Sequence, residues 1–194
     1  MHNTTARWGW LAKAFHWVMA LMVAVMVPLG YVMAETYQFN VISTQMEAVH
    51  VVLSRLHQSI GLLVLILVFV RLGWRVRQPI PQPPPGLAAY HKILARLNHA
   101  FLYVLLMLLP LSGWAALSAF GEAPTYFLWM EGLPSIVPKV PLEDTFGYGF
   151  FARIHRFAIY TGAALLALHV SAALWHHFAR KDTVLRRMWP LGQA

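Results

Sequence analysis

Four long stretches without a charged residue constrain the fold of this chain more than any other feature of its sequence. No Asp, Glu, Lys or Arg occurs in residues 14–34, 56–70, 97–121 or 157–179. An α-helix needs about 20 apolar residues to cross a bilayer. The second stretch is shorter, and there the long side chain of Arg71 can add a turn by reaching out to the lipid headgroups. The sequence therefore predicts an all-α, integral membrane four-helix bundle.

The composition supports this interpretation. Of the 194 residues, 59% are hydrophobic and 11% are charged, whereas soluble domains have about 25% charged residues. The length suits a single domain over residues 1–194. We expect its membrane-spanning helices at about residues 13–33, 54–74, 94–119 and 151–178.

Three connecting segments follow from these helices. Residues 35–50 are expected to form an outer loop, although Gln45 is an alternative start for the second helix. Prolines crowd residues 79–86, which cannot continue a helix and should form an extended inner connector. Residues 120–150 hold several aromatic residues among glycines and prolines, and they predict an ordered cap on the outer membrane surface.

The net charge of +8 is distributed unevenly between the two sides of the predicted bundle. One side receives four basic residues and six of the seven acidic residues. The opposite side receives the other eleven basic residues: Arg7, Lys13, Arg71, Arg75, Arg77, Lys92, Arg96, Arg180, Lys181, Arg186 and Arg187. The positive-inside rule then places both termini in the cytoplasm. Because these charges flank the spans, we expect membrane lipid and not nucleic acid as their partner.

The chain has no cysteine. Disulfides, iron–sulfur clusters and the C-x-x-C-H attachment of haem are therefore excluded. Any haem in this protein has to be held noncovalently.

Ten histidines are many for so apolar a chain, and several lie inside the predicted spans, where an ionisable group usually has a functional partner. His155 and His169 lie within about 40° of one helical face and about 21 Å apart along the fourth helix. His16 begins the first helix at the depth of His169, and His57 begins the second helix at the depth of His155. Each pair can hold a haem iron from both sides, which suits electron transfer because no coordination position stays open. We therefore predict two b haems with these four histidines as metal ligands.

Other histidines compete with this assignment. His50 lies seven residues before His57 on roughly the same helical face. His99 enters the third helix at the inner depth, where it can replace His16 or His169, or else line a quinone pocket or contact a haem propionate. Zinc explains the histidines less well, because a structural zinc site needs four ligands at one point. Otherwise His50 is expected to be interfacial, as are the remaining four, His2, His91, His176 and His177.

Two glycines lie close to the predicted ligands along the helices. Gly61 follows His57 by one turn, and Gly162 lies midway between His155 and His169. The absence of a side chain lets a flat macrocycle approach the backbone, but it serves close helix packing equally well.

At these residues the chain resembles the bacterial cytochrome b561 family, which is related to the cytochrome b subunits of nickel-iron hydrogenases and formate dehydrogenases. The resemblance covers nearly the whole chain and is carried by FHW at 15–17, LHQSIG at 56–61, VRL at 70–72, HAFLY at 99–103, LPLSG at 109–113 and ALWHHF at 173–178. It implies a bacterial inner-membrane cytochrome with His16 and His169 on the cytoplasmic haem b, and His57 and His155 on the outer one.

Some members of this family look like superoxide oxidases, which pass an electron from superoxide through the haems to ubiquinone. The resemblance therefore implies a superoxide:quinone oxidoreductase. Its catalytic candidates are Arg55, Arg153 and Arg156, which flank the outer haem ligands. A positive patch among acidic residues would attract the superoxide anion. The same arginines can instead, or in addition, neutralise haem propionates.

Two further interpretations stay open from the sequence. The chain can be a membrane anchor and electron relay for a separate redox protein, with no catalysis of its own. A transporter or haem-free scaffold is weaker, because it leaves the paired depths of the histidines unexplained. For the quinone, the sequence offers Arg71, His91, Lys92 and His99, or aromatic residues at either interface.

Overall fold

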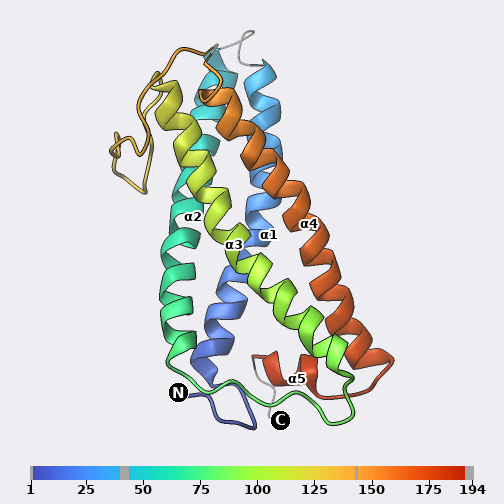
Figure 1. Ribbon diagram of the computed structural model, residues 1–194. Coiled ribbons are helices and arrows are strands. Elements are labelled where there is room, and N and C mark those ends of the chain that lie inside the picture. Colours follow the sequence, from blue (N-terminus) through green and yellow to red (C-terminus); the bar gives the residue numbers. More distant parts are fainter. Residues whose placement is uncertain (1, 40–43, 143, 191–194) are drawn as a thin grey trace. The chain divides into compact units, whose positions relative to one another are not determined.

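A computed structural model describes residues 2–39, 44–142 and 144–190 (Figure 1). Its helices are α1 (Trp10–Phe39), α2 (Thr44–Val76), α3 (Ala89–Phe120), α4 (Tyr148–Phe178) and the short α5 (Val184–Met188). The first four are each long and apolar enough to cross a membrane. No β-strand occurs in the described part of the chain, apart from one isolated bridge in a loop. The predicted all-α membrane fold is confirmed.

The long helices extend beyond the predicted spans. The outer loop expected at residues 35–50 is wrong in extent, because α1 continues to Phe39 and α2 begins at Thr44, next to the alternative start at Gln45. Residues 40–43 lie outside the described residues. With 30 residues, α1 is about 45 Å long, whereas the hydrocarbon core of a bilayer is about 30 Å thick. The first acidic residue thus marks the end of the apolar stretch and not the end of the helix.

Prolines lie inside two of the helices without ending them. Pro28 lies in α1 and Pro110 in α3, and both helices are continuous across these positions. Membrane helices tolerate proline where neighbouring groups satisfy the backbone that the proline leaves unpaired.

The chain divides into two compact units. The first unit holds Met1–Met19, Leu67–Leu106 and Ile159–Ala194, and the second unit holds Ala20–Ile66 and Met107–Ala158. Each unit therefore contains a section of all four long helices. Small side chains occupy the core of the second unit, where Ala119 and Ala158 are fully buried, and they allow helix backbones to approach closely.

Large apolar side chains cover the outside of the long helices. Leu21 is 67% exposed, Val27 is 66% exposed and Phe157 is 71% exposed. A soluble protein rarely leaves so much contiguous apolar surface uncovered. This apolar surface is therefore suited to contact with lipid.

The segments outside the helices are held in place by specific hydrogen bonds. In the first unit, the backbone N–H of Gln82 in the proline-rich connector donates to the carbonyl of Thr5 over 2.9 Å. In the second unit, residues 121–142 run beside α2 and α3 (Figure 1). Gln58 and Ser59 of α2 accept hydrogen bonds from backbone N–H groups of this segment over 2.7 and 2.9 Å. Part of the predicted cap is thus held against α2, and its place on the outer membrane surface stays a prediction.

Candidate metal centres

One pair of histidines lies between α2 and α4 in the second unit. The ring centroids of His57 and His155 are 6.3 Å apart, and the ring planes meet at 67°. Metal–imidazole bonds are about 2 Å long, so two imidazoles that hold one metal ion from opposite sides have ring centroids about 6 Å apart. The spacing of this pair therefore fits a single metal ion held between the rings.

The ring of His155 is oriented by α3. Its Nδ1 lies 2.8 Å from the carbonyl oxygen of Leu109 and 3.1 Å from Oγ of Ser112. The Ser112 hydroxyl itself donates to the Leu109 carbonyl over 3.0 Å, so its lone pairs are available to the histidine. A ring that donates through Nδ1 presents the lone pair of Nε2, which is the arrangement of most metal-ligating histidines.

Two glycines give the rings of this pair their space. A Cβ on Gly113 would lie 3.4 Å from Cε1 of His155, and a Cβ on Gly30 would lie 3.0 Å from Cε1 of His57. Nδ1 of His57 is buried without a hydrogen-bond partner among the described residues. One ring is thus fixed by hydrogen bonds, whereas the other is confined by the backbone of α1.

The glycines singled out from the sequence have a different role. A Cβ on Gly61 would meet Met26 at 3.7 Å, and a Cβ on Gly162 would meet Leu105 at 3.8 Å, both ordinary packing distances. Sequence reasoning missed Gly30 and Gly113. Each follows a proline within a membrane helix by two or three residues, and this shared pattern is the signal that would have found them.

A second pair lies between α1 and α4 in the first unit. The ring centroids of His16 and His169 are 6.1 Å apart, with the planes at 60°. His99 of α3 also approaches His169, but the centroid distance is only 5.2 Å. This is too short for two rings on opposite sides of one metal ion, which need about 6 Å. The geometry therefore favours His16 as the partner of His169, and Nδ1 of His99 contacts the Ala95 carbonyl instead.

Arg71 turns into the first unit and not towards the headgroups. Its Nη2 lies 3.3 Å from Nδ1 of His16, and its Nη1 lies 3.7 Å from the sulfur of Met19. The guanidinium also lies over the ring of Tyr103, 5.6 Å from the centroid. Aromatic and sulfur atoms replace water around the cation, so the expectation that Arg71 reaches the headgroups is wrong.

Histidines outside the two pairs form hydrogen bonds with other side chains. Nδ1 of His50 lies 3.1 Å from Oγ1 of Thr36, and its Nε2 lies 3.3 Å from Oγ of Ser54. With both ring nitrogens in contact with hydroxyl groups, His50 is a poorer ligand than His57.

Beyond α4, Nδ1 of His176 lies 2.6 Å from the carboxylate of Asp182, which also accepts a hydrogen bond from Arg180. Burial alone would raise the pKa of Asp182. The hydrogen bonds from His176, the backbone of Val184 and Arg180 outweigh burial and lower the pKa below its ordinary value.

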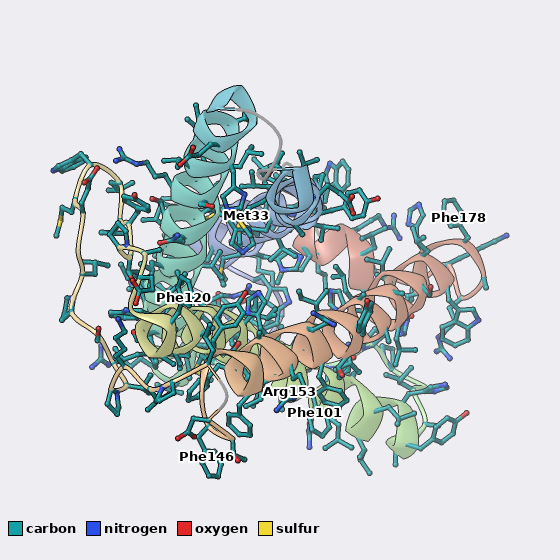
Figure 2. The ribbon with its side chains drawn as sticks, turned by 90° about the horizontal axis from the view of Figure 1, so that it is seen from above. Met33, Phe101, Phe120, Phe146, Arg153 and Phe178 are labelled. Atoms are coloured by element: carbon teal, nitrogen blue, oxygen red, sulfur yellow. The ribbon has the colours of Figure 1, made fainter. Side chains whose placement is uncertain are left out.

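The three outer arginines differ in their surroundings. Arg55 forms an ion pair with Glu131 and lies over the ring of Tyr126, 4.5 Å from its centroid. Arg153 and Arg156 are exposed and form no ion pair within the described residues. Arg153 lies two positions before His155, so its side chain leaves the helix about 200° around the axis from this candidate ligand. Figure 2 shows it on the flank of α4 that faces away from α1.

The two centres together define a class of protein. Among residues 2–39, 44–142 and 144–190, no three His, Cys, Asp or Glu side chains converge to hold a metal ion, which argues against structural zinc. Pairs of histidines suit haem, whose macrocycle supplies the other four iron ligands. The fold and the site thus describe a helical membrane protein with two pairs of facing histidines.

Comparison with known proteins gives the family. The family model for prokaryotic cytochrome b561 matches residues 7–191, and the chain belongs to this family. It is 31% identical to cytochrome b561 homolog 2 of Escherichia coli (strain K12) over 96% of the chain and 93% of that relative. Cytochrome b561 homolog 1 of the same organism is 33% identical over 69% of the chain and 73% of the relative.

A third relative carries a more specific name. A protein named probable superoxide oxidase CybB of Yersinia pestis is 30% identical over 70% of the chain and 73% of the relative. Membership of the family makes this chain a multi-pass membrane electron-transfer protein that binds haem b.

Proposed function

We propose that the chain is a single cytochrome b561 domain over residues 1–194 that holds two b haems and transfers electrons across a bacterial inner membrane. One haem is assigned to His16 and His169, and the other to His57 and His155. The observation that carries this proposal is the spacing of the ring centroids, 6.1 and 6.3 Å, which suits one metal ion between the rings of each pair.

Haem b, when bound, supplies a one-electron Fe(III)/Fe(II) couple. His16 with His169, and His57 with His155, would hold it noncovalently. Iron held by two histidines would supply electron transfer and not chemistry that needs an open ligand position. The contacts of His155 with Leu109 and Ser112 fix one ring orientation before a cofactor binds.

The direction of the chain in the membrane follows from its charges. All eleven basic residues predicted for the inner side belong to the first unit. The positive-inside rule therefore predicts that these basic residues and both termini lie at the cytoplasmic side. The electron donor then meets the side that carries Arg55, Arg153 and Arg156. We assign ubiquinone to the first unit, with Arg71, His91, Lys92 and His99 as candidate contacts.

Superoxide is the proposed donor, and the name of the relative from Yersinia pestis supports it. Two superoxide anions would give up one electron each to leave two molecules of O₂, while the quinone takes both electrons and two protons to become quinol. Arg153 and Arg156 supply exposed positive charge that attracts the anion. Arg55 contributes less, because Glu131 compensates its charge.

The pairing of the histidines is tested by counting haem in variants. The wild-type protein should contain two b haems per chain by pyridine haemochrome, with six-coordinate absorption bands. His16→Ala and His169→Ala should each lose one haem, and the double variant should lose the same one and no more. His57→Ala and His155→Ala should behave in the same way for the other haem.

His50→Ala and His99→Ala are the matched controls and should retain both haems. A wild-type protein without haem would sink the proposal. Loss of a haem in His99→Ala, with His16→Ala unaffected, would replace His16 by His99 as a ligand.

A second candidate function is electron relay for a separate redox protein. The turn closed by the bridge between Phe127 and Met130 exposes Leu128, Trp129 and Met130 by 41, 83 and 46%. Such an apolar tip on the outer segment suits a protein partner or the membrane interface. A stable redox partner on co-purification, together with slow direct oxidation of superoxide, would favour the relay.

A further inference from the structure

The two histidine pairs differ in what lies behind one ring of each pair. In the first unit, the neighbour of His16 is a cation, because Nη2 of Arg71 lies 3.3 Å from Nδ1 of the ring. Guanidinium is only a donor. When Nε2 of His16 holds a metal, Nδ1 carries the proton and cannot accept from Arg71, so no hydrogen bond joins the two groups. Arg71 then acts on the centre through its positive charge.

In the second unit, the neighbours of His155 are acceptors. The Leu109 carbonyl and the Ser112 hydroxyl lie 2.8 and 3.1 Å from Nδ1. A ligating imidazole that donates its second N–H to an acceptor becomes more basic. More electron density on the ligand stabilises the oxidised metal. Ser112 is only 4% exposed, so water does not compete for this hydrogen bond.

The wider charge of each unit reinforces this local difference. The first unit contains eleven basic residues and one acidic residue, Asp182, which gives a formal charge of +10. Asp182 is already engaged by His176 and Arg180. The second unit contains four basic and six acidic residues, which gives −2. A positive surrounding favours the reduced centre, because reduction adds a negative charge.

These contacts point to unequal reduction potentials: the geometry assigns the higher potential to the haem on His16 and His169 and the lower potential to the haem on His57 and His155. Arg71 and the acceptors behind His155 are the positioning residues that set the difference. The assignment rests on the proposed two-haem function. It gives electron transfer its direction, downhill from the second unit to the first.

A redox titration of the purified full-length holoprotein tests this, with the two haems followed by their absorption bands. Arg71→Gln should lower the higher midpoint potential by about 59 mV, which corresponds to a tenfold change in the equilibrium constant of a one-electron couple. Arg71→Lys keeps the charge and should restore most of the loss. Arg77→Gln, which removes an exposed charge near the end of the same helix, should change little.

Ser112→Ala should raise the lower midpoint potential. The equilibrium constant for reduction should change roughly fivefold or less, because the Leu109 carbonyl still accepts a hydrogen bond from His155. His57→Ala, which retains only the first-unit haem, assigns the midpoints independently of Arg71. Equal or reversed midpoints in a protein with two haems would overturn the inference and leave the proposed function intact. A shift of the lower midpoint by Arg71→Gln would also overturn it, whereas a wild-type protein without two haems would defeat the proposed function itself.

Discussion

Replacing Gly30 by alanine tests whether the backbone of α1 confines the ring of His57. The new Cβ would lie 3.0 Å from Cε1 and 3.4 Å from Nδ1 of the ring. Ordinary carbon contacts are about 3.5–4.0 Å, so the ring has to retreat by about half an ångström. Overpacking of this kind costs about 1–3 kcal/mol, and less where the neighbouring side chain can move. We expect a loss of about 1–2 kcal/mol in haem binding at this pair.

That loss corresponds to an affinity roughly five- to thirtyfold weaker for one of the two haems. The assay is haem content per chain, followed by the rate of haem transfer to excess apomyoglobin. Only one haem should leave faster, because the change touches one pair. The matched control is Gly73→Ala, since no atom lies within 4 Å of a Cβ built at that position. Wild-type haem retention in Gly30→Ala, or an equal loss in Gly73→Ala, would refute the steric reasoning.

Three further predictions concern charged side chains. The pKa of Asp182 is lowered in the folded protein, so its carboxylate stabilises the folded state fully above about pH 4. This stabilisation is lost as the pH falls through the pKa that Asp182 has in the folded protein. Asp182→Asn should lower the Tm at pH 7 by about 3 °C and remove this part of the acid sensitivity, measured by thermal unfolding across pH. The double change of Arg153 and Arg156 to glutamine should slow the reaction with superoxide several-fold at low salt and flatten its salt dependence in stopped-flow traces; unchanged rates would remove the steering role. Glu131→Gln should speed the same reaction modestly, because it uncovers the charge of Arg55.

The helices illustrate how far local sequence information reaches. Apolar stretches determine which segments enter a membrane, because lipid forces each one to satisfy its own backbone hydrogen bonds. The four long helices follow from this alone. Their ends do not, since helix propensity continues past the first charge; the expected loop at residues 35–50 was wrong for that reason. The structure extends α1 to Phe39 and starts α2 at Thr44.

The sequence also supplied the candidate ligands, because the spacing of two histidines on one helix is fixed by helical geometry. It left open whether His99 or His16 faces His169, and whether His50 or His57 belongs to the outer pair. Those choices depend on how neighbouring helices rotate and pack. The distances of 6.1 and 5.2 Å to His169 favour His16 only once three helices are in place.

The four membrane-spanning helices and the set of histidines are thus determined by the sequence itself, since hydropathy and helical periodicity act between neighbours along the chain. The surroundings of each ring were decided by the tertiary structure. Arg71 turns inward to His16, and Leu109 and Ser112 reach His155 from another helix. Gly30 leaves room for a ring on α2. Contacts between residues far apart in sequence depend on helix packing, which no local pattern encodes.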